Sequence, residues 1–309
     1  MRSLTKSLPL LPLLVCVVGA CGDDDPVATG KGTVKFTTWG EEYIEDEIPV
    51  APGPDDESGF TDGWQLKYTK FLVNVSAITV ADASGNVVAK LDKPRFFDNV
   101  KPGKKDLIEF PNIDAKAYPQ VSYEITPAVA DAQIVGGADP ADLTMMVTNG
   151  WSVYAAGTAT KGDVTKTFKW GLKAQTRYEN CNVEEDGIDK IGIVVTNGQT
   201  DVSELTTHGD HFFYDQLQSG DNAKKTLLRF QEKADADAND DGEITIQELC
   251  AKNIDPAVYN TSGLPGATIG DFVISLVRTV GHFRGEGECT VKRIDPVPAG
   301  VVNPCDEYK

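Results

Sequence analysis

The sequence is poor in positive charge. Of its 309 residues, 29 are Lys or Arg and 47 are Asp or Glu, giving a formal net charge of −18 at pH 7. Nucleic-acid binding needs basic side chains at the phosphates, so we expect no nucleic-acid partner. A cationic membrane-surface role is disfavoured on the same ground. Hydrophobic residues make up 40% and charged residues 25% of the chain, values typical of a globular protein and not of a disordered one.

Motifs that would mark an enzyme are also missing. The sequence contains no GxSxG, no P-loop and no GxGxxG before a helix. The metalloprotease motif HExxH is absent, because Gly209 stands where that motif has its Glu. No two cysteines have CxxC spacing, which disfavours a redox motif or a zinc knuckle. We therefore expect that the protein is not an enzyme.

The N-terminal residues resemble a bacterial lipoprotein signal. Arg2 and Lys6 precede a short apolar run at residues 8–18, which is too short to span a bilayer as a helix. The run leads into Val-Gly-Ala and then Cys21, and small residues before a Cys at this distance resemble a lipobox. The alternative is an ordinary secretory signal cut near Ala20, with an incidental Cys.

These features predict a signal peptide at 1–20, a lipid on Cys21 and a flexible tether at 21–32. By resemblance to known sorting rules, Gly22 in place of an Asp favours the outer membrane. The expected location is therefore the bacterial cell envelope, facing the periplasm or the exterior. The N-terminal lipid is the expected membrane contact, because an acidic surface repels an anionic membrane.

Four cysteines remain after the signal and the lipidation site. An even number of cysteines in an exported chain predicts two disulfides, and three pairings are open. We expect them to tie the C-terminal region to the end of the first domain. They are Cys181, Cys250, Cys289 and Cys305.

The chain is expected to be mainly β, with a helical C-terminal unit. Strands are expected at 33–38, 64–81, 87–89, 106–110, 120–125, 145–156, 165–178 and 191–195. Their spacing favours an antiparallel β-sandwich over residues 33–211. Helical periodicity predicts helices at 216–234, 246–252 and 269–283. The second region, 212–309, is thus expected to be a disulfide-tied unit that contains one EF-hand-type helix-loop-helix.

Residues 237–248 read DANDDGEITIQE and resemble an EF-hand calcium loop. Gly242 falls where the loop turns sharply, and Ile244 falls where an apolar residue pins it. The alternative is a solvated acidic loop before a helix. The expected Ca²⁺ ligands are Asp237, Asn239, Asp241, the backbone carbonyl of Glu243, Thr245 and a bidentate Glu248.

The predicted Ca²⁺ site is expected to be structural. We find no second loop, although EF-hands usually pair. Methionine occurs only at positions 1, 145 and 146, so the Met-rich groove of a sensor EF-hand is missing. Outside the cytosol, calcium is abundant enough to keep a weak site filled.

The chain contains three histidines, His208, His211 and His282. The first two stand at HxxH spacing in THGDHFFYD, and the third lies in GHFRGEGEC, at the end of the last expected helix. Imidazole binds copper and zinc, and three ligands with an open position would form a catalytic or transfer site. The alternative is a structural pair whose rings bond the backbone in a buried corner.

Acidic residues near the histidines are candidate further ligands or hydrogen-bond acceptors, namely Asp210, Asp215 and Glu286. A separate segment, WGEEYIE at 39–45, places aromatic residues beside three carboxylates. It fits a sugar-stacking or ion site, although such a run is more often a solvated loop with one aromatic folded inward.

The segments WGEEYIE, DGWQLKYTKFLV, THGDHFFYD and GHFRGEGEC, with the single EF-hand loop, resemble a family of uncharacterised bacterial lipoproteins over most of residues 33–290. A fainter likeness in β-architecture is to the MbnP-like periplasmic proteins linked to copper. In that family the copper ligands include His and a modified Trp. None of these ligands is carried over to a position here. The likeness implies only a metal role for His208 and His211.

The leading hypothesis is a membrane-anchored, extracytoplasmic calcium-binding lipoprotein that also binds copper or zinc at its histidines. The first alternative is a calcium-dependent adhesion or glycan-binding module with WGEEY exposed. The second is a metallohydrolase that uses HxxH with a nearby carboxylate as base. The sequence leaves the identity of a protein or glycan partner open.

Overall fold

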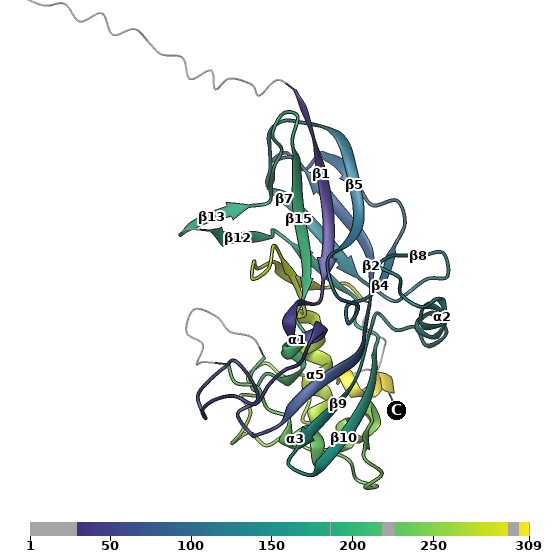
Figure 1. Cartoon of the computed structure of the whole chain (residues 1–309), viewed down its shortest axis with the longest axis vertical. Helices are drawn as coiled ribbons and strands as arrows, with labels where there is room; N and C mark the ends of the chain where they lie inside the picture. The colour runs from purple at the N-terminus through teal and green to yellow at the C-terminus, as the bar shows by residue number, and fades with distance from the viewer. Residues whose placement is uncertain (1–29, 186, 218–225, 296–302, 309) are drawn as a thin grey trace, which may run out of the picture.

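The structure, a computed structural model, describes residues 30–185, 187–217, 226–295 and 303–308. The described part is mainly β, as the sequence predicts. Strands β1, β5, β7 and β15 form its upper part in Figure 1, and the helices α3 and α5 gather below beside β9 and β10. The expected signal, Cys21 and most of the tether lie outside the described residues. No helix within those residues is long and apolar enough to cross a membrane.

The first sheet has the strand order β17-β15-β1-β5. Its strands are β1 (Lys31–Trp39), β5 (Lys105–Asp114), β15 (Thr200–Thr207) and β17 (Gly281–Phe283). The strand pairs β1–β5 and β15–β17 are antiparallel, but β1 and β15 are parallel. The expectation of antiparallel pairing throughout is therefore wrong, because a long excursion of the chain separates β1 from β15.

The long strand β2 (Gln65–Ala81) is the central strand of the second sheet. Its first half pairs with β9 (Val153–Lys161) and its second half with β7 (Gln120–Ile125). Register shifts along β2 let one strand serve both neighbours, because each shift increases the local twist. The other strands are β3 (Val87–Lys90), β4 (Arg95–Asp98), β8 (Gln133–Ile134), β10 (Val164–Leu172), β11 (Thr176–Glu179), β16 (Glu243–Ile244) and β18 (Thr290–Arg293).

Short strands and short helices complete the fold. Two strand pairs stand apart from the large sheets: β12 (Asn182–Glu185) with β13 (Ile188–Ile191), and β6 (Ala117–Tyr118) with β14 (Ile193–Val194). The β12–β13 hairpin projects from the body (Figure 1). The α-helices are α1 (Glu41–Glu45), α2 (Pro140–Asn149), α3 (Gln231–Ala234), α4 (Ile246–Ala251) and α5 (Ile269–Leu276). The 3₁₀-helices are η1 (Asp210–Phe213), η2 (Val277–Thr279) and η3 (Pro304–Tyr308).

Residues 145–149 are helical, which corrects the strand expected there. They form the second half of α2, whose start is capped by Asp139 through a hydrogen bond from the N–H of Ala141. Pro140 occupies the first turn, and Gly150 ends the helix at φ +66°. These are strong start and stop signals for a helix, and they outweigh the β-propensity of the apolar residues between them.

The C-terminal helices are shorter than expected. Helix α5 ends at Leu276, and after η2 the chain enters β17, so His282 lies on a strand and not at a helix end. Within the expected helix 216–234, only α3 is helical among the described residues. Leu228 makes β-bridges to Phe60 and Tyr214 instead, because an extended backbone delivers its side chain to the core. Helix α4 confirms the helix expected at 246–252.

One hydrophobic core runs through both expected regions. Phe36 and Phe168 of the sheets belong to the same buried cluster as Phe213, Ile244 and Phe272, which come from the C-terminal part. Side chains of the expected region 33–211 therefore pack against side chains of the expected region 212–309. The histidine segment crosses this shared core, so its position depends on both parts of the chain.

The four remaining cysteines form two disulfides, as their even number predicts. Cys181, just after β11, pairs with Cys289 in the loop after β17. Cys250 of α4 pairs with Cys305 of η3. The first disulfide ties the end of the β-rich part to the C-terminal segment, and the second lies within the C-terminal part.

A fully buried lysine packs against the segment that carries His211. Lys233 of α3 has no exposed surface, and its Nζ lies 5.7 Å from the ring centre of Phe213 and 5.1 Å from that of Tyr259. Its Nζ donates to the Arg229 carbonyl oxygen at 3.1 Å. Burial lowers the pKa of Lys233 from 10.5 to about 7, although the Asp62 carboxylate opposes the shift.

We predict that Lys233 makes the protein more stable as the pH rises from about 7 to 9. In this window the unfolded chain keeps the Lys233 proton and the folded chain releases it, so the unfolded state binds more protons. The free energy of unfolding should rise by up to about 1.4 kcal/mol per pH unit from this group. Urea unfolding followed by tryptophan fluorescence measures it. Lys233→Met should flatten the slope, and an unchanged slope in that variant would contradict the prediction.

Candidate metal centre

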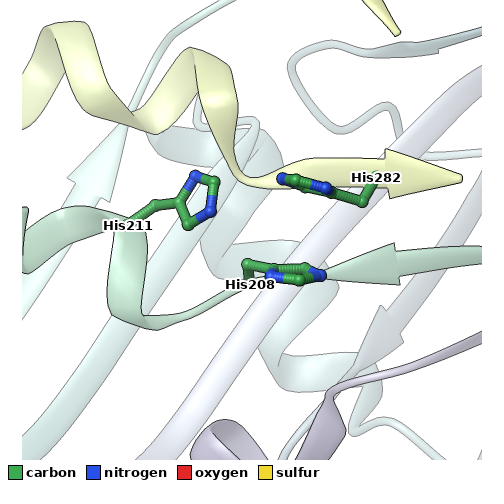
Figure 2. Close-up of side chains that lie close together, drawn as sticks. All are labelled: His208, His211 and His282. Atoms are coloured by element: carbon green, nitrogen blue, oxygen red, sulfur yellow. The ribbon is translucent and has the colours of Figure 1, made fainter. Parts of the chain in front are cut away.

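Strand pairing places His208 and His282 on one face of the first sheet. In the β15–β17 register, Thr206 lies opposite His282, and the backbone N–H of His208 extends the ladder to the Val280 carbonyl oxygen at 2.8 Å. Side chains two residues apart on a strand share a face, so His208 and His282 are diagonal cross-strand neighbours. Their rings stack with centroids 4.0 Å apart and an angle of 23° between planes (Figure 2).

A tight turn after His208 brings His211 to the same place. Gly209 directly precedes η1 as its N-cap residue, and its carbonyl oxygen accepts a hydrogen bond from the Tyr68 hydroxyl at 2.6 Å. The His211 ring stands edge-on to the other two, with centroid distances of 5.3 Å to His208 and 5.0 Å to His282. Figure 2 shows His211 facing the stacked pair. The structure therefore brings all three histidines together, which the sequence alone did not show for His282.

The three histidines form a buried group of ligand atoms. One nitrogen from each ring lies within 4.8 Å of the others. The exposed fractions are 7% for His208, 6% for His211 and 6% for His282. Nε2 of His208 and Nδ1 of His282 are buried and make no hydrogen bond. Unpaired buried polar atoms are costly, so this group has the character of a site built for a ligand.

A hydroxyl group sets the tautomer of His211. The Thr279 hydroxyl donates its single proton to the Leu276 carbonyl oxygen at 2.8 Å. Its oxygen lies 2.8 Å from Nδ1 of His211 and must therefore accept from that nitrogen. Nε2 of His211 then keeps its lone pair. A second hydrogen bond that orients a ring in this way is typical of metal-binding histidines.

The surroundings keep two of the rings neutral. Burial and the neighbouring imidazoles lower the pKa of His282 to about 3 and that of His211 well below its usual value. Neutral imidazole is the form that binds a metal. Burial also opposes charge on His208, but contact with the Glu41 carboxylate outweighs it and raises the pKa of His208.

Acidic residues adjoin the group on the side of His208. Glu41 Oε2 lies 3.3 Å from Nε2 of His208, an ion-pair distance without hydrogen-bond geometry. Glu286 completes a second group with Glu41 and His208, whose ligand atoms again lie within 4.8 Å of one another. Asp210 is nearly buried and accepts a hydrogen bond from Tyr214, and burial raises the pKa of its carboxyl group.

The structure shows which of the acidic residues considered as metal ligands lie near the histidines. Glu286 lies beside His208, whereas Asp215 is engaged with Arg229 and with the N–H of Leu227. Sequence reasoning did not connect Glu41 to the histidines, although it marked WGEEYIE as a possible ion site. It missed Thr279 entirely, and no sequence signal pointed to it, because its role depends on how α5 ends.

The predicted calcium loop is folded around Asp237. The Asp237 side chain has no exposed surface, and its Oδ2 accepts from the Gly242 N–H at 2.9 Å and from Lys166 at 2.6 Å. Its Oδ1 is buried and has no hydrogen-bond partner. Gly242 has φ +85°, which fits the sharp turn expected there.

The other predicted calcium ligands lie along the same loop. Asn239 Oδ1 accepts from the N–H of Asp241, and Asp241 Oδ1 accepts from the N–H of Glu243. Thr245 and Glu248 cap the start of α4 reciprocally. Within the described residues, no three carboxylates of this loop have ligand oxygen atoms that all lie within 4.8 Å of one another, whereas three nitrogen atoms of the histidines do. The loop therefore stays a predicted calcium site.

Comparison of the chain with protein-family models, with curated proteins and with solved structures gave no significant match.

We predict that Gly209→Ala destabilises the protein by about 1–3 kcal/mol and displaces the His211 turn. A Cβ atom at Gly209 would lie 2.6 Å from Cγ1 of Ile44 and 2.9 Å from Cε2 of Tyr68, and both side chains are buried. Thermal and urea unfolding measure the loss. Gly53→Ala is the control, because a Cβ there meets nothing within 4 Å. Equal stability of the two variants would contradict the prediction, because it would show that the surroundings of Gly209 accommodate a Cβ atom without loss of stability.

Proposed function

We propose that the protein is an extracytoplasmic, lipid-anchored metal-binding protein whose main site is the histidine group His208, His211 and His282. The observation that carries the proposal is the convergence of three buried rings, two of them with a nitrogen atom that makes no hydrogen bond, from segments about 70 residues apart in the chain. A histidine-poor chain that gathers every histidine at one point uses them together.

The donor set fits copper or zinc. Three imidazole nitrogens suit both metals and leave a fourth position open. Calcium and magnesium prefer oxygen ligands, so they fit this group poorly. Met145 and Met146 pack in a separate core cluster with α2, which supports a nitrogen-based site. A bound ion would pair the orphaned nitrogens of His208 and His282.

Binding, and not catalysis, is the role that we propose. A hydrolase of the HExxH type needs a carboxylate at the position of Gly209, where a side chain would clash with Ile44. The two segments that carry the histidines are buried and joined to each other by the β15–β17 pairing. These features favour a site that holds or passes on a metal.

The extracytoplasmic location is part of the proposal. The lipobox-like Cys21 and the two disulfides support it, because disulfides persist in oxidising compartments. The expected tether would hold the folded part near the membrane without requiring a basic surface, although its last two residues, Lys31 and Gly32, belong to β1.

We further propose that residues 237–248 bind one Ca²⁺ as a single EF-hand-type unit. The unpaired Oδ1 of Asp237, the bond from Gly242 to Oδ2 and the positive φ of Gly242 support it. In this chain β16 pairs with β10, and Trp170 of β10 donates to the Ile244 carbonyl oxygen at 2.9 Å. Strand β10 thus gives the loop the support that a second EF-hand usually gives.

Elemental analysis of the mature protein, purified from an oxidising compartment without chelator or affinity tag, tests the main proposal. We expect about one equivalent of copper or zinc per chain, retained or taken up on titration. His211→Ala/His282→Ala should weaken this binding by about a hundredfold or more, because only one of the three imidazoles remains. Calcium binding in the same variant is the internal control. Unchanged copper and zinc affinity would overturn the histidine site.

Calcium titration by calorimetry tests the second proposal. Glu248→Gln should weaken Ca²⁺ binding by about tenfold or more, because it removes the bidentate carboxylate. Asp240→Asn removes the same charge from an exposed position that the loop register leaves out of the ligand set, and should have little effect. Equal losses in both variants would indicate a general charge effect and no specific site.

A further inference from the structure

Two groups of ligand atoms meet at one residue. His208 belongs to the buried group with His211 and His282, and also to the group with Glu41 and Glu286. In each group the ligand atoms lie within 4.8 Å of one another. The two groups differ in exposure, because Glu286 is exposed, Glu41 is half-buried and all three histidines are buried. The carboxylates are therefore the more solvent-accessible ligands of the two groups.

His208 is placed to contact an ion on the acidic side. Its side chain is only 7% exposed, and its Nε2 is buried without a hydrogen bond. The nearest carboxylate oxygen, on Glu41, is 3.3 Å from this nitrogen. A cation between the two would satisfy both groups.

The fold holds both carboxylates in position. Glu41 has a left-handed backbone at φ +54°, and Ile44 of the same short helix α1 is fully buried. Such a conformation is strained for Glu and persists only where its surroundings enforce it. Glu286 stands in a loop closed by the bond from the Phe283 N–H to the Gly287 carbonyl oxygen at 2.9 Å and by the Cys289 disulfide.

We propose that Glu41, His208 and Glu286 form an outer station that captures a Cu²⁺ or Zn²⁺ ion and passes it to the buried histidine group. This inference rests on the proposed metal site. His208 stays bound during the transfer, while the carboxylate oxygens of Glu41 and Glu286 are exchanged for nitrogens of His211 and His282. Both carboxylates are then free of the ion, and the oxidation state of the ion does not change.

The direction of transfer follows from ligand chemistry. Two carboxylates and one imidazole bind these ions less tightly than three imidazoles, so the ion moves inward with a gain in free energy. The negative charges of Glu41 and Glu286 raise the local concentration of cations and their association rate. The station thus acts on rates, and the histidines set the final affinity.

Stopped-flow mixing of the metal-free mature protein with Zn²⁺ tests the station. In Glu41→Gln/Glu286→Gln we expect association to slow by about tenfold or more and to depend less on salt. Because the final site is unchanged, dissociation should slow by the same factor, with the stoichiometry and the equilibrium affinity retained. The control is Glu42→Gln/Glu47→Gln, which removes two exposed carboxylates in and just after α1 and should keep near wild-type rates.

Three results would overturn the inference. Wild-type rates in Glu41→Gln/Glu286→Gln, or equal slowing in the control, would exclude a specific outer station. Faster dissociation with lower equilibrium affinity would show that Glu41 and Glu286 bind the ion in the same final site as the histidines, and not in a separate station. If the wild-type protein binds neither Zn²⁺ nor Cu²⁺, the proposed metal site and the station both fall. This outcome differs from the first two, in which the wild-type protein binds metal and only the station fails.

Discussion

The short pairing of β15 with β17 is the constraint on which the histidine group depends. Only three residue pairs connect these strands, yet their register places His282 diagonally across from His208. A slip by one residue would turn one of the two rings to the opposite face of the sheet. The pairing is held at both ends, by the hydrogen bond from the His208 N–H to Val280 and by the bond from the Arg284 N–H to the Glu204 carbonyl oxygen.

The turn that carries His211 is supported from the opposite side by aromatic packing. Phe212 and Phe213 follow His211 and pack against Trp170 at centroid distances of 6.3 and 6.0 Å. Trp170 also donates to Ile244 in the predicted calcium loop. A continuous set of buried contacts therefore links this loop to the histidines. The two proposed metal sites share one rigid support, although each is formed from its own ligands.

Local patterns were readable from the sequence, and long-range ones were not. The β-rich character, helix α4 and the presence of two disulfides follow from propensity, capping and cysteine number, which depend on neighbouring residues or on composition. The helix over residues 145–149 was missed because apolar strand-like residues hid the Asp139 and Gly150 caps. The parallel β1–β15 pair and the strand position of His282 depend on contacts between distant segments. The same holds for Glu41, which reaches His208 only because β1 lies beside β15.

The Cys181–Cys289 disulfide has a consequence for how the protein matures. Cys289 stands three positions after Glu286 and fastens that loop to Cys181, which lies between β11 and β12. While both thiols are reduced, the loop is held only by the hydrogen bond from the Phe283 N–H to the Gly287 carbonyl oxygen. Glu286 is then less firmly positioned beside Glu41 and His208. If the histidines bind a metal as proposed, oxidation of the thiols would then set how fast a newly made chain takes it up. Full speed would be reached only on arrival in an oxidising compartment, and a chain retained among cytosolic reductants would acquire metal slowly.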